Sequence, residues 1–154
     1  MKLHSFKEKQ SLSISIEEAW KFFSDPRNLS LITPKSLNLK INSTQEISQM
    51  FPGQIITYLV KPFYGFSFSW VTEITHVDSP KYFVDEQRFG PFKFWHHQHH
   101  LNSVAQGVIM EDIIHYALPG DPFSRIVHPL IRKKLIDIFS HRKIELNKRF
   151  NEND

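Results

Sequence analysis

The chain has 154 residues and a formal net charge of +3, with 19 Lys and Arg against 16 Asp and Glu. This length predicts one domain, residues 1–154, that is large enough for a single hydrophobic core. The chain contains no cysteine, which excludes a disulfide framework, a thiolate zinc site and a thiol nucleophile.

The distribution of charge and apolar residues narrows the class of protein further. The net charge is small for a nucleic-acid binder, so no nucleic-acid partner is expected. The start of the chain has no apolar signal-peptide core, and no apolar run is long enough for stable membrane insertion, so a cytoplasmic protein is expected. The 14 Phe, 3 Trp and 4 Tyr residues suit a lined hydrophobic cavity as well as a packed core.

The first part of the chain predicts one strand and two small helices. Residues 3–12 have the pattern of a partly exposed edge strand. Ser15 and Glu18 form a capping box before an apolar pattern with helical spacing, which predicts a short amphipathic helix. Asp25 and Pro26 then begin a second small helix, which Pro34 ends.

From residue 37 onward the apolar pattern alternates with a period of two, which predicts strands. The predicted strands cover about 37–41, 55–60 and 66–74, then three more up to residue 116. Short turns rich in Pro and Gly separate them. Together with residues 3–12, these strands predict a seven-stranded antiparallel sheet.

The stretch 85–116 carries the polar residues that most suggest chemistry. Because side chains alternate between the faces of a strand, one predominantly apolar face is expected to hold a defined set. It consists of Trp95, His97, His99, Leu101, Val108, Met110, Asp112, Ile114 and Tyr116.

A turn centred on residues 104–105 would place His97 opposite Asp112 and His99 opposite Met110. A buried aspartate needs a partner, and a histidine across the ladder is a suitable one. Three interpretations follow: a satisfied polar patch, a group that orients a ligand or does acid/base work, or a metal site. The metal signal, two histidines and one carboxylate, is the weakest of the three, and no metal is expected.

The last part of the chain predicts one long helix from Pro129 to about Phe150, after a lead-in over 123–128. Its apolar positions are Leu130, Ile131, Leu135, Ile138, Phe139, Leu146 and Phe150. The intervening basic residues predict a solvated face: Arg132, Lys133, Lys134, Arg142, Lys143 and Lys148. No phosphate-binding glycine loop and no Gly-x-Ser-x-Gly motif occurs, so no cofactor is expected.

This order of elements resembles the SRPBCC superfamily, which includes START domains, the birch-pollen allergen group and polyketide cyclases. The motifs that carry the resemblance lie in residues 22–34, 85–99, 112–119 and 139–142, and they are similar to those of a bacterial subgroup sometimes labelled cell-division inhibitors. Leu101 and Val108 depart from that pattern, where an aromatic residue and a threonine are more usual. The resemblance implies an α+β helix-grip fold, in which a seven-stranded curved sheet surrounds a long C-terminal helix and leaves a cavity.

Within such a fold, the inward face of the sheet would line the cavity. The candidate ligand-binding residues are Trp70, Gln87, Trp95, His97, His99, Met110, Asp112 and Tyr116. Three loops, residues 62–66, 89–92 and 118–123, are expected to cluster at one end, either as an aromatic rim or as a plug.

Three functions remain open from the sequence. The first is binding of a small hydrophobic molecule or lipid in the cavity. The second is a cyclase-, aromatase- or hydrolase-like enzyme in which His97 and Asp112 are the catalytic pair. The third is a regulatory interaction domain that uses the aromatic rim or the basic helix.

Overall fold

The computed structural model describes residues 2–42, 49–63, 66–120 and 123–151. Its elements follow one another in the order β1 (His4–Leu12), α1 (Ile16–Phe23), η1 (Pro26–Ile32), η2 (Lys35–Leu37), β2 (Lys40–Ile41), β3 (Gln54–Phe63), β4 (Phe66–Asp78), β5 (Tyr82–Phe89), β6 (Phe94–Val104), β7 (Gly107–Ala117) and α2 (Ser124–Phe150). The two elements labelled η are short 3-10 helices.

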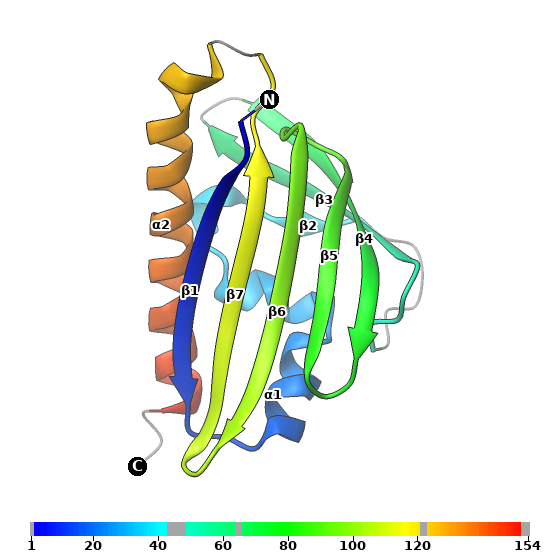
Figure 1. Ribbon diagram of the computed structural model, residues 1–154, viewed down its shortest axis with the longest axis vertical. Coiled ribbons are helices and arrows are strands. Elements are labelled where there is room, and N and C mark those ends of the chain that lie inside the picture. The colour runs from blue at the N-terminus through cyan, green and yellow to red at the C-terminus, as the bar shows by residue number, and fades with distance from the viewer. Residues whose placement is uncertain (1, 43–48, 64–65, 121–122, 152–154) are drawn as a thin grey trace.

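The strands form one seven-stranded antiparallel sheet in the order β1-β7-β6-β5-β4-β3-β2. Figure 1 shows that this sheet curves and that α2 runs along its open side. Irregular pairing between β4 and β5, at residues 71–72 and 74–76, interrupts the ladder where the sheet bends. The predicted helix-grip architecture is confirmed.

The local signals at the start of α1 form as the sequence predicts. The Ser15 hydroxyl accepts a hydrogen bond from the Glu18 amide at 3.2 Å, and the Ser15 amide donates to Glu18 Oε2 at 3.0 Å. These two bonds satisfy backbone amides that have no partner within the helix. Ala19, Trp20 and Phe23 then bury the apolar side of α1.

Asp25 and Pro26 begin η1 as expected, with Asp25 Oδ1 accepting from the Arg27 amide at 3.0 Å. The strand predicted over 37–41 is mostly wrong. Leu37 ends η2, Asn38 follows with φ of 43°, and only Lys40–Ile41 pair with β3. A left-handed residue cannot continue a pleated strand, so β2 is confined to the two residues that remain.

The inward face of β6 and β7 is confirmed, but the predicted pairing is wrong by two residues. His99 lies opposite Asp112 and His97 opposite Ile114, because the turn is Ala105-Gln106 rather than residues 104–105. A shift of two residues keeps each side chain on its face, since the side-chain period of a strand is two. The face was therefore predictable, whereas the partner across the ladder was not.

The C-terminal helix begins earlier than predicted, because α2 starts at Ser124 and contains Pro129. Of the residues expected as a lead-in, 124–128 are therefore helical, and Phe123 is the N-cap. Pro129 has no amide hydrogen, so it leaves one helical bond unmade, to the carbonyl of Arg125. Arg125 is exposed, so water can take the place of the missing donor.

The helix α2 packs on the sheet through part of its predicted apolar set. Leu135 and Phe139 join a hydrophobic cluster with Trp95, Ile114 and Tyr116. Leu130, however, is 55% exposed. None of the helices in the described part of the chain combines the length and the apolar character that a bilayer span needs.

Candidate ligand-binding site

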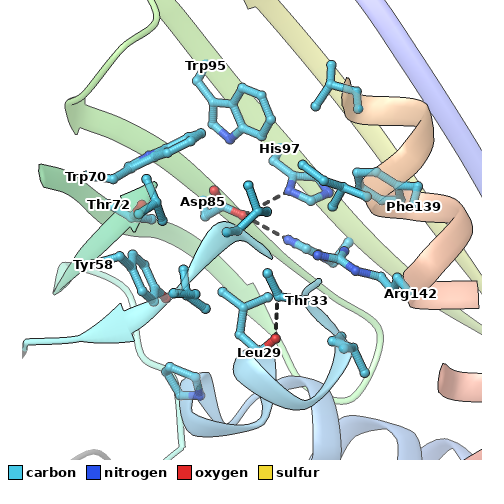
Figure 2. Close-up of a pocket in the computed structure, with 18 of the residues that line it drawn as sticks. Leu29, Thr33, Tyr58, Trp70, Thr72, Asp85, Trp95, His97, Phe139 and Arg142 are labelled. Atoms are coloured by element: carbon cyan, nitrogen blue, oxygen red, sulfur yellow. Dashed lines mark hydrogen bonds and ion pairs between the residues drawn. The ribbon is translucent and has the colours of Figure 1, made fainter. Parts of the chain in front are cut away.

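A cavity of about 270 Å³ lies between the inner face of the sheet, η1 and α2. Figure 2 shows side chains from these elements turned toward it. Most of its wall is apolar and aromatic, including Leu29, Trp70, Phe92, Trp95, Leu135 and Phe139. The volume lies just below the usual range of about 300–1,000 Å³ for small-molecule pockets, so the cavity suits a small ligand.

Five of the eight candidate binding residues line this cavity: Trp70, Trp95, His97, His99 and Met110. Trp70 and Trp95 meet edge to face with ring centroids 5.1 Å apart. His97 and His99 are 5% and 9% exposed, so neither imidazole points into bulk water. Gln87, Asp112 and Tyr116 do not line the cavity.

Two of those three residues support the structure beside the cavity. The side-chain amide of Gln87 donates to the Phe92 carbonyl at 2.7 Å and accepts from the Phe92 amide at 3.2 Å. Gln87 thus holds the connection between β5 and β6. The Tyr116 hydroxyl lies 3.1 Å from His128 Nε2, which ties β7 to the first turns of α2.

The polar end of the cavity is a closed network of two carboxylates and two imidazoles. Asp85 Oδ2 lies 3.3 Å from His97 Nδ1 and 2.8 Å from His99 Nε2. On the other side, Asp112 Oδ1 lies 2.8 Å from His97 Nε2 and 3.0 Å from His99 Nδ1. Asp112 therefore sits behind the imidazoles rather than facing the cavity.

The network shifts the pKa values of its members in the directions that ion pairing requires. Burial lowers the pKa of His97, but the carboxylates of Asp85 and Asp112 outweigh it, and the pKa is raised above its usual value. Burial raises the pKa of Asp85 and of Asp112, but both imidazoles outweigh it, and both pKa values lie below their usual range. The charged forms of His97, Asp85 and Asp112 thus stabilise one another.

Arg142 is a site residue that the sequence reasoning placed wrongly, on the solvated face of the last helix. It is only 8% exposed and lines the cavity. Its guanidinium carbon lies 4.5 Å above the Phe139 ring, and Nη1 is 3.7 Å from Asp112 Oδ1. Within the described ranges, its Nε has no hydrogen-bond partner.

The sequence contains signals for Arg142 and Asp85, two cavity residues that were not among the candidates. Arg142 follows Leu135 and Phe139 at intervals of seven and three, which places it on the same side of a helix as these buried residues. Asp85 is two residues from Gln87, so both lie on the same face of a strand. At both positions the spacing indicates a buried face, although the charge of the side chain favours an exposed one.

Smaller polar groups lie on the opposite wall of the cavity. Tyr58 is 8% exposed, and burial followed by the charge of Asp85 raises the pKa of its hydroxyl, which therefore stays protonated. The Thr33 hydroxyl donates to the Leu29 carbonyl at 2.6 Å, as Figure 2 shows. These groups add polar contacts without adding charge.

The described residues of the three loops predicted to cluster lie at the same end of the sheet, beside the start of α2 (Figure 1). Pro91, Phe92 and Leu118 line the cavity, whereas the side chains of Phe66, Phe89 and Phe123 are 68%, 66% and 72% exposed. Residues 64–65 and 121–122, and the side chains of 62–63, lie outside the described part. Among the described residues of these three loops, some apolar side chains line the cavity and others are exposed.

Solved structures share this architecture at low sequence identity. The chain is 12% identical to TTHA0849 from Thermus thermophilus, with a TM-score of 0.74 over 95% of this chain and 96% of that one. It is 13% identical to the ginseng major latex-like protein 151 from Panax ginseng, with a TM-score of 0.67 over 97% and 98% of the two chains. For Ara h 8.0201, identity is 16% and the TM-score 0.63, over 96% and 99%.

At these identities the likeness establishes the fold alone. No protein-family model and no curated protein matches the chain. The fold and the site together define a helix-grip domain with an internal cavity that has one charged end. The helix-grip fold that the resemblance implies is confirmed, whereas membership of the SRPBCC superfamily and the cell-division label stay predictions.

Proposed function

We propose that this protein binds a small, largely apolar molecule in the cavity between the sheet and α2. One observation carries the proposal: the wall is mostly apolar and aromatic, and a cluster of ionisable side chains, His97, His99, Asp85 and Arg142, meets at one end of it. Removing apolar surface of the ligand from water supplies affinity, and the charged end supplies orientation.

The polar group of the ligand is a hydrogen-bond acceptor in this proposal. Arg142 can only donate, and its buried Nε has no partner within the described ranges. A buried donor without a partner costs about 1–3 kcal/mol, and a carbonyl, hydroxyl or carboxylate oxygen of the ligand would remove that cost. The expectations of a lipid-like partner and of a cytoplasmic location remain predictions.

The direct test is native mass spectrometry of the protein purified from its source, which is expected to show one organic molecule per chain. In parallel, calorimetry with decanoic acid and with decanol is expected to show one binding event for each. Thr72→Phe fills the cavity from β4 and should abolish both. Ser69→Phe, on the exposed face of the same strand, is the matched control.

The position of the polar group is tested separately. Arg142→Leu should weaken decanoic acid binding about 10- to 100-fold, the loss expected for a hydrogen bond to a charged group. Arg132→Leu, a change on the same helix at a residue that does not line the cavity, should leave it unchanged. Binding that survives Thr72→Phe would place the probe outside the cavity and contradict the proposal.

The enzyme alternative has one specific observation in its favour, the 2.8 Å contact between His97 Nε2 and Asp112 Oδ1. The raised pKa of His97 favours its protonated form, which suits the role of proton donor better than that of general base. Conversion of the co-purified molecule by the protein, lost in His97→Ala and kept in His100→Ala, would establish it. The third alternative, a regulatory interaction domain, needs no cavity, so the cavity does not support it.

A further inference from the structure

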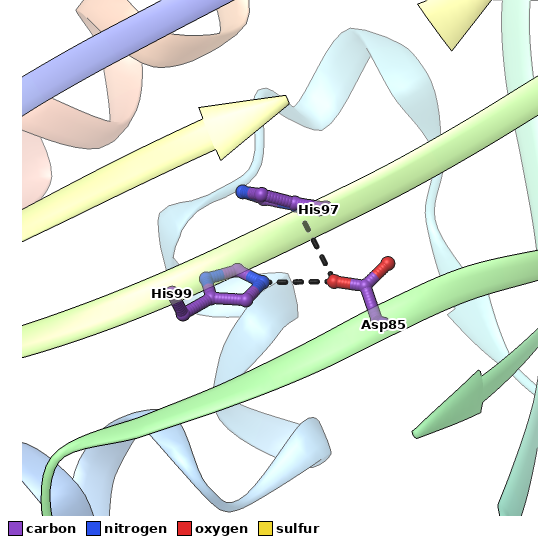
Figure 3. Close-up of side chains that lie close together, drawn as sticks. All are labelled: Asp85, His97 and His99. Carbon is purple, nitrogen blue, oxygen red and sulfur yellow. Dashed lines mark hydrogen bonds and ion pairs between the residues drawn. The ribbon is translucent and has the colours of Figure 1, made fainter. Parts of the chain in front are cut away.

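Three donor atoms at the charged end of the cavity are grouped as metal ligands are. Asp85, His97 and His99 each offer one donor atom, and these three atoms lie within 4.8 Å of one another. Figure 3 shows the carboxylate beside the two rings. First-row metals hold such donors at about 2.0–2.2 Å, so neighbouring ligands lie about 3 Å apart. The oxygen-to-nitrogen separations of 3.3 Å and 2.8 Å match that spacing.

The far side of each imidazole also has the arrangement of a metal site. A histidine that binds a metal through one ring nitrogen usually donates the proton on its other nitrogen to a carboxylate or carbonyl. Here Asp112 Oδ1 lies 2.8 Å from His97 Nε2 and 3.0 Å from His99 Nδ1. One buried carboxylate therefore stands behind both rings, and Arg142 Nη1 lies 3.7 Å from that carboxylate.

Counting hydrogen atoms shows why a cation would complete this arrangement. A neutral imidazole carries one ring proton and an imidazolium carries two, so the four contacts to Asp85 and Asp112 are all satisfied only if both rings are protonated or if a cation replaces the protons on the Asp85 side. His99 Nδ1 illustrates the problem, because it is buried at 3.0 Å from Asp112 Oδ1 yet makes no hydrogen bond of acceptable geometry with the described residues. With a cation on the Asp85 side, both ring protons can face Asp112.

We propose that Asp85, His97 and His99 bind one divalent first-row transition metal ion at the charged end of the cavity. Two imidazoles and one carboxylate, without thiolates, favour Zn²⁺ or Fe²⁺ over Mg²⁺ or Ca²⁺. All three ligands line the cavity, so the remaining coordination positions face it. The metal site goes beyond the proposed binding function and does not depend on it.

The test uses the full chain without an affinity tag, stripped with a chelator and titrated with Zn²⁺ by calorimetry. One Zn²⁺ per chain is expected, with release of protons on binding. Asp85→Asn and His99→Gln should each abolish this binding, and Asp112→Asn should weaken it about 10- to 100-fold, as for other residues behind the ligands. His100→Gln removes a neighbouring imidazole on the outer face of β6 and should change nothing.

Nitrogen NMR of the histidine rings tests the wild-type protein and so does not depend on the variants folding. On addition of Zn²⁺, the resonances of His97 Nδ1 and His99 Nε2 should become those of metal-bound nitrogens, while His97 Nε2 and His99 Nδ1 keep their protons. An unchanged spectrum at both rings, or Zn²⁺ binding that folded Asp85→Asn and His99→Gln retain, would overturn the proposal.

Discussion

At the scale of single residues, Asp112 holds the charged network together. Its carboxylate is 6% exposed and faces His97, His99 and Arg142, all of which are at least nine-tenths buried. Burying charges is costly, and the cost is offset only while each charge keeps its partner. The network therefore depends on its one carboxylate that faces away from the cavity.

We expect Asp112→Asn to lower the free energy of unfolding by about 3–5 kcal/mol, because it leaves buried positive charge without its partner. Asp137→Asn, which breaks an exposed pair with Lys133 on α2, should cost less than about 1 kcal/mol. Urea unfolding of both variants measures the difference. An equal loss of free energy of unfolding in both variants would show that the buried contacts of Asp112 stabilise the fold no more than an exposed ion pair does.

At the scale of elements, β1 and α2 meet through two stacked histidines. The rings of His4 and His128 have centroids 3.7 Å apart, and the Tyr116 hydroxyl lies 3.1 Å from His128 Nε2. Burial, then the charges of His128 and Lys2, lower the pKa of His4. Burial, then the charges of Lys2 and Arg132, lower the pKa of His128.

These lowered pKa values predict that the contact between β1 and α2 weakens in acid. Between the folded pKa and the unfolded value of 6.5, the unfolded chain binds more protons. The free energy of unfolding is therefore highest above that unfolded value and falls as the pH drops from it toward the folded pKa. His97 contributes the opposite pH dependence of the free energy of unfolding, because its folded pKa is raised. The contribution of His4 and His128 is therefore isolated by comparing the wild type with variants.

The measurement is urea unfolding of the wild type, His128→Gln and the control His76→Gln at about pH 7.5 and about pH 5.5, on either side of the usual histidine pKa. His128→Gln should lose less free energy of unfolding between the two conditions than the wild type. His76 lies on β4, away from this contact, and its substitution should leave the wild-type difference in place. A His128→Gln protein with the same pH dependence as the wild type would exclude the histidine pair as its source.

At the scale of the whole molecule, the three tryptophans report on two separate regions. Trp20 packs between α1 and the sheet, with its ring centroid 6.0 Å from that of Phe83, and does not line the cavity. Trp70 and Trp95 form part of the cavity wall. A ligand inside the cavity therefore touches two of the three indoles.

Decanoic acid should change the fluorescence of the wild type and of Trp20→Phe in the same way. A protein with both Trp70→Phe and Trp95→Phe should lose that change, because only Trp20 then emits. Fluorescence titration of the three proteins measures this. A ligand-induced change that persists in the double variant would place the ligand near Trp20 rather than beside Trp70 and Trp95.

The order of the elements, the capped start of α1 and the inward face of β6 and β7 could be predicted from the sequence alone. These features depend on neighbours along the chain and on a side-chain period of two or of 3.6 residues, which a sequence shows directly. It likewise indicated His97 and His99 as residues of the cavity wall.

The partners of the site residues, in contrast, follow from the three-dimensional packing of the chain. The turn at Ala105-Gln106 put His99 opposite Asp112, the pairing of β5 with β6 brought Asp85 to the two imidazoles, and the packing of α2 buried Arg142 beside them. Such contacts join residues far apart in the chain, and their geometry depends on how strands register and how a helix docks on a sheet. No local pattern contains that information, because a shift of two residues along a strand leaves the same face buried.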